Sequence, residues 1–295
     1  MNLCIGTVQF GLPYGIASAG HPTPESSIEM LEYAVHAGIR TIDTAGAYGN
    51  AEEIVGEFLS GTDRSKVRVV TKIKPNALDG VPKSQYSGAL KSNIEASLKR
   101  LRIDYVDGCL FHNAAYVHNT HALQALSLLK EDRLALKTGV SIYLPDEFRT
   151  AASSPFVDLI QIPYNILDRR LNAALENKRP GLEIHARSAF LQGLLLMRED
   201  SVPSHIAGAK KYIRAIEDFC REHSISRAAL LLGYVKAQST INQIVFGVDN
   251  LSQLRQIISD YQIEINPSAL RKLAEELAGA DEYIIMPSLW KGDSK

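Results

Sequence analysis

Four side chains far apart in the sequence are of the types that surround a proton donor. They are the phenol of Tyr48, the amine of Lys72, the carboxylate of Asp43 and the imidazole of His112. Each stands at or shortly after the end of an apolar run rich in Val, Ile and Leu. Since none of them is a good nucleophile in this combination, the chemistry they suggest is protonation of an oxygen while a cofactor supplies a hydride.

A tyrosine becomes a better acid when a cation lies beside it. The phenol of a free tyrosine has a pKa of about 10, and a fall of roughly two to three units corresponds to about 3–4 kcal/mol. An ammonium about 4 Å away supplies about 4 kcal/mol at an effective dielectric constant of about 20. We therefore expect Lys72 to lower the pKa of Tyr48, with Asp43 as the countercharge that keeps the buried amine protonated. His112 is expected to orient the carbonyl oxygen by donating a hydrogen bond.

Short apolar runs that alternate with longer amphipathic stretches predict how these residues are positioned. The runs expected to form strands are Leu3–Thr7, Ile39–Asp43, Val67–Lys72, Tyr105–Phe111, Leu136–Ser141, Val157–Gln161, Leu182–Ala186 and Ile241–Phe246. The stretches expected to form the helices between and after them are Ser26–Ala37, Ala51–Ser60, Ser84–Leu101, His121–Asp132, Asp146–Ala152, Arg170–Glu176, Ala209–Glu222 and Leu251–Ile258. This alternation predicts an α/β protein with a parallel sheet.

Eight such units favour a (β/α)8 TIM barrel over the alternative, an open doubly wound sheet. We expect one domain over residues 1–295, with extra helices at Ser226–Ala237 and Pro267–Leu277. The polar stretch Arg198–Gly208 is expected to be a long loop over one face. Tyr283 and Trp290 in the tail have two equal interpretations, a lid over the substrate or docking contacts. In such a barrel the active groups stand at the carboxyl ends of the strands.

The bulk properties exclude several classes of partner. The net charge of −1 over 295 residues offers no field that would attract nucleic acid or an anionic membrane surface. No apolar run approaches the length of a membrane span, and the first residues do not have the pattern of a signal peptide. We expect a cytoplasmic protein. Its Cys4, Cys109 and Cys220 contain no CxxC pair, so neither a zinc site nor a redox dithiol is expected.

Several segments together resemble the aldo-keto reductase superfamily, in order and over nearly the whole chain. They are GTVQFGLPYG, IDTAGAYGNAEEIVGEFL, VVTK, YVDGCLFH, KTGVS, LIQIPYNILDRR, ARSAFLQGLL and VFGVDNLSQL. The RSAFLQGLL segment is similar to a bacterial branch of that family. The resemblance implies that Asp43, Tyr48, Lys72 and His112 are the catalytic tetrad. It also implies a small-molecule carbonyl substrate, sugar-like in one reading, and NADPH as cofactor with NADH as the alternative.

The resemblance also implies a cofactor site, in which Ser141 and Gln161 would bind the nicotinamide carboxamide. The full set is Gly6, Thr7, Asp43, Ser141, Gln161, Arg187, Ser188, Phe190, Gly193, Gly247, Asn250 and Gln253. The chain departs from the family at three places. Ile142 replaces a common Asn, Arg187 stands where an aromatic ring usually stacks on the nicotinamide, and Gly247 and Gln253 replace the cations that often bind the 2′-phosphate of NADP. Arg255 is close in sequence to that site but out of register.

Two other functions remain open from the sequence. A Schiff-base aldolase would use Lys72 or Lys74 as nucleophile, but a carboxylate beside Lys72 would raise the pKa that such a lysine must have lowered. A non-catalytic barrel could bind nicotinamide as a sensor or dock on a partner. No metal is expected: His112, His118 and His121 are close in sequence, but no nearby thiol completes a zinc set.

Overall fold

Eight parallel strands close into one barrel in the order in which they follow in the sequence. The computed structural model describes residues 1–16 and 20–290. The strands are β1 (Leu3–Gly6), β2 (Thr41–Asp43), β3 (Arg68–Ile73), β4 (Gly108–Phe111), β5 (Thr138–Ser141), β6 (Leu159–Pro163), β7 (Glu183–Arg187) and β8 (Gln243–Phe246). Pairing of β1 with β8 completes the closure. The (β/α)8 barrel is therefore confirmed, and the open doubly wound sheet is excluded.

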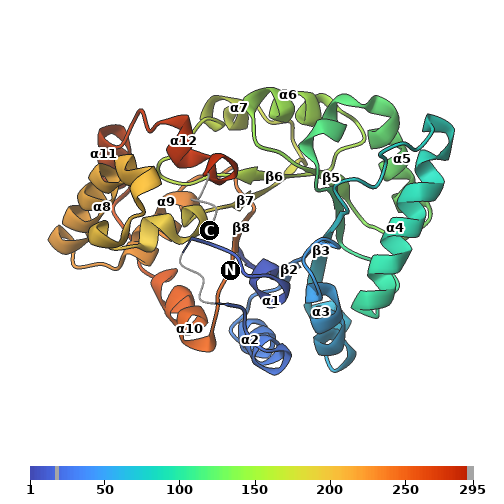
Figure 1. Ribbon diagram of the computed structural model, residues 1–295, viewed down its shortest axis with the longest axis horizontal. Helices are drawn as coiled ribbons and strands as arrows, with labels where there is room; N and C mark the ends of the chain where they lie inside the picture. Colours follow the sequence, from blue (N-terminus) through green and yellow to red (C-terminus); the bar gives the residue numbers. More distant parts are fainter. Residues whose placement is uncertain (17–19, 291–295) are drawn as a thin grey trace.

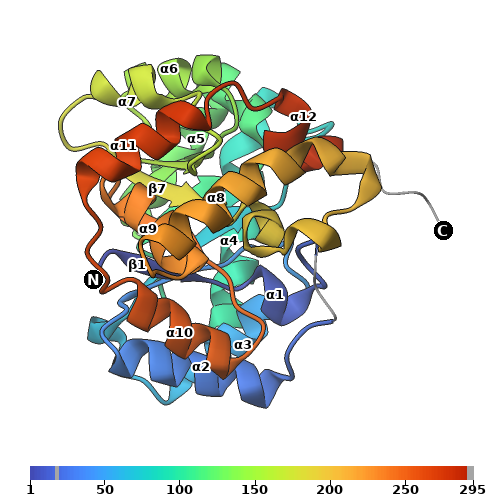
Figure 2. The same cartoon turned by 90° about the vertical axis from the view of Figure 1, so that its left-hand side faces the viewer.

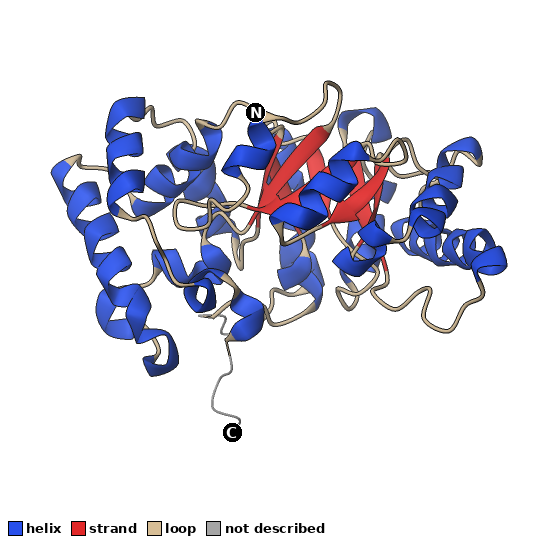
Figure 3. Ribbon diagram, turned by 90° about the horizontal axis from the view of Figure 1, so that it is seen from above, coloured by secondary structure: helices blue, strands red, loops and turns tan. Residues whose placement is uncertain are grey.

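Helices surround this barrel on all sides (Figures 1 and 3). They are α2 (Pro24–His36), α3 (Ala51–Ser60), α4 (Tyr86–Leu101), α5 (Thr120–Glu131), α6 (Pro145–Ser153), α7 (Asn172–Glu176), α8 (Lys210–Glu222), α9 (Arg227–Lys236), α10 (Leu251–Asp260) and α11 (Pro267–Glu276). Helix α2 shows how local chemistry sets a boundary: Thr23 caps it by accepting a hydrogen bond from the Ser26 N–H, and Pro24 occupies its first position. Within the described residues, every helix is too short or too polar to span a bilayer.

The chain after β8 forms more structure than the sequence indicates. Helices α10 and α11 were predicted, and a short helix α12 (Glu282–Ile285) follows them. Figure 2 shows α11 beside α8 on the outer side of the barrel, where Tyr212 donates a hydrogen bond to the Gly279 carbonyl at 3.3 Å. Trp290 donates to the Tyr283 carbonyl at 2.8 Å, and both side chains pack against the core. Neither lines the main cavity, which favours docking contacts over a lid.

Several predicted strand boundaries differ from the observed ones by one to three residues, and two of these shifts have a physical reason. Tyr105 and Leu136 were placed inside strands, but they are 37% and 57% exposed and precede the barrel strands β4 and β5. Each belongs to the connection that enters the barrel, where Val106 and Ala135 make one isolated bridge. The predicted loop at 198–208 contains a 3-10 turn, Glu199–Ser201, and a 3-10 segment, Ser204–Ala209, that is kinked at Ile206. Strand β1 ends one residue earlier than predicted, and the short helix α1 (Val8–Gly11) follows it.

The barrel interior is built in layers, and this layering places the polar residues. Val70, Leu110 and Leu159 form a separate apolar cluster inside the barrel. Side chains two positions apart in a strand point the same way. Lys72, His112 and Gln161 each follow one of these three residues by two positions, so they form the next layer toward the carboxyl ends of the strands.

Candidate active site

Asp43 and Lys72 form a buried ion pair at the carboxyl end of the barrel. Asp43 ends β2, Lys72 lies in β3, and they are 3% and 1% exposed. The Lys72 amine donates to Asp43 Oδ1 at 2.5 Å and to the Thr44 carbonyl at 3.0 Å. Gln161, from β6, donates its amide to Asp43 Oδ2 at 2.7 Å. Both carboxylate oxygens are therefore engaged, as a buried charge requires.

The pair keeps the amine charged. Burial alone would lower the pKa of Lys72, but the charge of Asp43, the Tyr48 phenol and the hydrogen bond to Asp43 together raise it above its ordinary value. The amine is an ammonium at neutral pH, which agrees with the role expected for Asp43. A lysine in this state is a poor Schiff-base nucleophile. Lys74 is exposed and does not line the cavity.

Tyr48 lies in the loop between β2 and α3, and two glycines hold this loop against α1. A Cβ at Gly11 would lie 1.9 Å from the Tyr48 carbonyl oxygen. Gly49 has φ +55°, and a Cβ there would lie 2.3 Å from the Gly11 carbonyl oxygen. The backbones of these segments therefore touch directly, which only glycine at both positions permits. This contact fixes the position from which the Tyr48 ring projects.

The ring of Tyr48 lies beside Lys72 and His112. The Lys72 amine is 5.2 Å from the centre of the Tyr48 ring, and the His112 ring meets it edge-on with centroids 5.6 Å apart. The four residues of the predicted tetrad, which span 70 positions of the sequence, are thus brought together at one mouth of the barrel.

The expected fall in the pKa of Tyr48 does not occur. Burial raises the pKa of this phenol more than the charge of Lys72 lowers it, and Asp43 raises it further against a lowering by Arg187. The sequence argument counted the lysine charge alone. The same carboxylate that keeps Lys72 protonated also opposes the effect of Lys72 on the phenol, and desolvation is the largest contribution. Tyr48 therefore starts as a neutral phenol, the protonation state that a proton donor needs.

His112 follows β4 and is held neutral. Burial lowers its pKa to about 4, and the nearby charges of Lys72 and Arg187 add to this against Asp43. Its Nδ1 atom is buried, with no hydrogen-bond partner among the described residues. A neutral imidazole that carries a free ring nitrogen can still donate or accept one hydrogen bond, depending on its tautomer.

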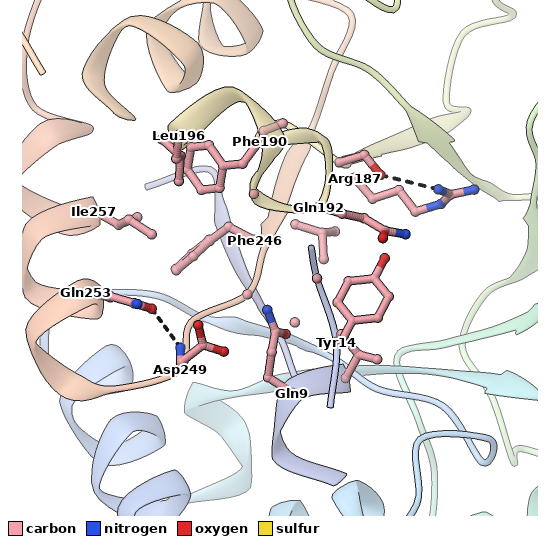
Figure 4. Close-up of a pocket in the computed structure, with 18 of the residues that line it drawn as sticks. Gln9, Tyr14, Arg187, Phe190, Gln192, Leu196, Phe246, Asp249, Gln253 and Ile257 are labelled. Carbon is pink, nitrogen blue, oxygen red and sulfur yellow. Dashed lines mark hydrogen bonds between the residues drawn. The ribbon is translucent and has the colours of Figure 1, made fainter. Parts of the chain in front are cut away.

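A cavity of about 450 Å³ extends toward α10 from Tyr48 and Asp43, the two members of the predicted tetrad that line it; Lys72 and His112 do not line it. Figure 4 shows Tyr14, Gln192 and Arg187 at one end and Asp249, Gln253 and Ile257 at the other. The predicted cofactor residues that line its wall are Gly6, Thr7, Asp43, Gln161, Arg187, Ser188, Phe190, Gly193, Gly247 and Gln253, while Ser141 and Asn250 do not line it. Lining residues that the sequence analysis did not single out include Gln9, Tyr14, Gln192, Asp249 and Gln256.

Ser141 and Arg187 interact with each other. Arg187 donates to the Ser141 hydroxyl at 3.3 Å and to the Ile142 carbonyl at 3.1 Å, and its guanidinium lies 4.4 Å from the centre of the Tyr143 ring. Arg187 was expected to stack on a nicotinamide; here it stacks on a tyrosine while it lines the cavity. Its position in the wall places one cation near the tetrad.

Asn250 has a structural role in this structure. It caps α10 by accepting a hydrogen bond from the Gln253 N–H at 2.9 Å, and Gln253 in turn accepts one from the Asp249 N–H at 2.8 Å. Asn250 therefore acts as a helix cap, and its contact with a cofactor stays a prediction.

Within the part of the chain that the structure describes, the wall includes bare backbone and polar atoms without partners. Gly6 and Gly247 present bare backbone to the cavity, and a Cβ at Gly247 would lie 2.2 Å from the side-chain amide of Gln9. Gln9 Oε1 and Asp249 Oδ1 are buried, with no hydrogen-bond partner among the described residues. Unpartnered polar atoms in a cavity wall are the groups that a ligand would satisfy.

The chain matches a known family and known folds. The model of the aldo/keto reductase family matches residues 2–277. Among curated relatives, the "NADH-specific methylglyoxal reductase" of Escherichia coli K12 is 27% identical over 85% of this chain and 88% of its own length. A probable aldo-keto reductase from Glycine max is 25% identical over 87% of this chain and 81% of its own. Among solved structures, an aldo-keto reductase from Bacillus halodurans in its holo form gives a TM-score of 0.75 at 20% identity, covering 97% and 95% of the two chains.

These findings agree with the barrel and with the polar layer at its carboxyl end. The family match spans nearly all the strands and helices described above. The chain therefore belongs to the aldo/keto reductase family.

Proposed function

We propose that this protein reduces an aldehyde or ketone to an alcohol with a nicotinamide cofactor. The observation that supports this most strongly is the buried Lys72–Asp43 pair, which joins Tyr48 and His112 at one end of an open cavity. Burying each of these charges costs several kcal/mol of desolvation, a cost that a packed apolar pair in the same place would avoid. A buried pair therefore indicates a role beyond packing. A proton donor with its supporting charges in a cleft is a pattern typical of an active site.

Each member of the tetrad has one task in this proposal. Tyr48 donates its phenolic proton to the carbonyl oxygen as negative charge develops there. Lys72 stabilises the phenolate that results, and Asp43 and Gln161 hold the ammonium and its counterion in place. His112, neutral at physiological pH, donates a hydrogen bond that orients the carbonyl. A reduced nicotinamide held by the cavity wall would supply the hydride to the carbonyl carbon.

The cavity wall supplies residues for the cofactor and for the substrate. Gln161, Ser188 and Arg187 near Tyr48 would hold the nicotinamide end, and the segment from Gly247 to Ile257 would hold the far end. The sequence predicts NADPH, with NADH as the alternative. The name of the Escherichia coli relative, an NADH-specific reductase of methylglyoxal, supports the alternative and a small reactive aldehyde as substrate.

The direct test is a cofactor-consumption assay on the purified protein. NADH and NADPH would each be offered with methylglyoxal, with simple aldehydes and with open-chain sugars, and the loss of reduced-nicotinamide absorbance would be followed. Turnover of at least one carbonyl is expected. Tight cofactor binding with no turnover of any carbonyl would instead favour the non-catalytic barrel. The absence of both binding and turnover would refute the proposal.

A further inference from the structure

The end of the cavity opposite Arg187 carries an acidic side chain. Asp249 follows β8 and lines the wall there beside Gln253 (Figure 4). Its Oδ1 atom is buried without a hydrogen-bond partner among the described residues. A buried carboxylate oxygen left unsatisfied is costly, so this position favours a ligand that brings a donor to it.

The backbone near Asp249 offers little to a phosphate. The N-terminus of a helix is a common anion site because its N–H groups are free. Here the Gln253 N–H is bonded to Asn250, and the Asp249 N–H is bonded to the Gln253 side chain. Two of the donors that would bind an anion at the start of α10 are therefore already satisfied by side chains of the same segment.

Positive side chains are directed elsewhere. Among the described residues that line the cavity, Arg187 is the one cation, and it lies at the opposite end with Ser141. Arg255, the cation closest in sequence to Asp249, lies 5.1 Å over the ring of Tyr33 and is not in the wall. Arg227, next to the lining residue Ala228, is paired with Glu217 at 3.3 Å.

The cavity therefore discriminates by charge at one position of the cofactor. If the nicotinamide end reacts beside Tyr48, the part of the wall left for the other nucleoside is the one formed by Asp249, Gln253 and Ile257 at α10. The two cofactors differ in that nucleoside by a single group: NADH has a 2′-hydroxyl, which can donate a hydrogen bond to a carboxylate. NADPH has a 2′-phosphate, which carries a charge of about −1.5 to −2 and is repelled by one.

We propose that this protein selects NADH over NADPH, and that the Asp249 carboxylate is the residue that sets the preference. This inference rests on the proposed function, since it requires a nicotinamide cofactor in the cavity. It assigns to Asp249 the contact with the ribose hydroxyl, and it assigns to Gly247 and Gln253 no role beyond shaping the wall.

The test is a binding measurement that does not depend on turnover. Isothermal titration of the full-length protein with NADH and with NADPH gives both dissociation constants. We expect NADH to bind at least about tenfold more tightly, or ~1.4 kcal/mol. In Asp249→Asn the two affinities should lie within about threefold of each other, and in Asp249→Arg NADPH should bind more tightly. Added salt should strengthen NADPH binding to the wild type, because screening weakens the repulsion.

Asp104→Asn is the matched control. It removes the same charge from an exposed residue that precedes β4, at the other end of the barrel, so both dissociation constants should be unchanged. Equal or tighter binding of NADPH by the wild type would overturn the inference and leave the proposed function standing. An NADH preference that persists in both Asp249 variants would overturn the role of Asp249. If neither cofactor binds the wild type, the proposed function fails, and this inference fails with it.

Discussion

Both ends of the barrel contain buried ionisable groups, but the two ends use them differently. At the amino-terminal end, Glu183 begins β7 and accepts hydrogen bonds from His185 at 2.8 Å and from Lys137. The hydrogen bond from His185, followed by the contribution of Lys137, lowers the pKa of Glu183 to about 2 against the effect of burial. At the carboxyl end, Asp43 and Lys72 form a comparable pair. The difference lies in what stands next to each pair.

An open cavity is what separates the two ends. His185 and His112 each have an Nδ1 atom without a partner among the described residues. His185, however, is 1% exposed, and neither it nor Glu183 lines the cavity. His112 is not in the cavity wall either, but its neighbours Tyr48 and Asp43 are. A buried polar group on its own therefore indicates structure, and the same group beside a cleft indicates function. This agrees with the general rule that the carboxyl end of such barrels carries the chemistry and the amino-terminal end carries stability.

The largest effect should come from the phenol at the carboxyl end. Tyr48→Phe removes the proton donor but keeps the ring and its contacts, so kcat should fall by about 10²–10⁴-fold, the usual contribution of a general acid. The dissociation constant for the cofactor should change by less than about threefold, because the ring still fills its place beside Lys72. Steady-state kinetics and titration calorimetry measure the two quantities separately.

Tyr14→Phe is the control for this substitution. Tyr14 also lines the cavity, and desolvation raises the pKa of its phenol. Removing that hydroxyl should leave kcat within about tenfold of the wild type. Equal losses of kcat in both variants would contradict a specific role for Tyr48. They would also contradict the assignment of the chemistry to the tetrad at the carboxyl end of the barrel.

The ion pair at the carboxyl end should cost stability when it is broken. Lys72→Met leaves the Asp43 carboxylate buried with only Gln161 as a side-chain donor. The free energy of unfolding should fall by about 3–5 kcal/mol, as for other buried pairs that lose one partner. Denaturation in urea measures this. In the double variant Lys72→Met/Asp43→Asn the loss should be smaller, since no charge remains unpaired; a larger loss would show that the pair is not the source of the effect.

Much of this arrangement could be predicted from the sequence. Strand ends are marked by apolar runs, so the convergence of Asp43, Lys72 and His112 followed once eight strands were recognised. The direction of the pKa shift of Tyr48 could not be predicted in the same way. It depends on how much of the phenol is desolvated and on how far Asp43 cancels Lys72, and both are properties of the folded cavity.

The role of Asp249, at the opposite end of the cavity, could not be predicted from the sequence for a different reason. Gly247 and Gln253 stand in the sequence where the cations of a phosphate site often stand. A lone Asp before a helix is usually a cap or turn residue, so the sequence alone does not single out Asp249. The local hydrogen bonds assign the cap to Asn250 instead, which leaves Asp249 free to face the cavity. Only the coordinates distinguish these two roles.

The amino-terminal end offers a prediction about stability and pH. Glu183→Gln should lower the free energy of unfolding by about 3 kcal/mol at pH 7, since the pKa of Glu183 falls from 4.5 to about 2 on folding. A carboxylate whose pKa is lower in the folded state than in the unfolded state stabilises the fold at pH values above the unfolded-state pKa. That stabilisation is lost as the pH falls toward the folded-state pKa. The difference between wild type and variant should therefore narrow by roughly 1 kcal/mol between about pH 7 and pH 4. Turnover should be unchanged. A loss of kcat in Glu183→Gln would contradict the assignment of stability to the amino-terminal end and of chemistry to the carboxyl end.

The smallest effect concerns the imidazole at the carboxyl end. Because burial and the nearby cations hold the pKa of His112 at about 4, the ring is neutral throughout the range from about pH 5 to pH 8. The pH profile of kcat/KM should then show no limb from this residue near 6.5, the ordinary value for histidine. In His112→Gln, which keeps a hydrogen-bond donor, kcat/KM should fall by less than about tenfold with the same flat profile. A limb near pH 6.5 that is present in the wild type and absent from His112→Gln would mean that His112 works as a cation. His112 would then act as a charged group, like those at the amino-terminal end, and not as a neutral hydrogen-bond donor.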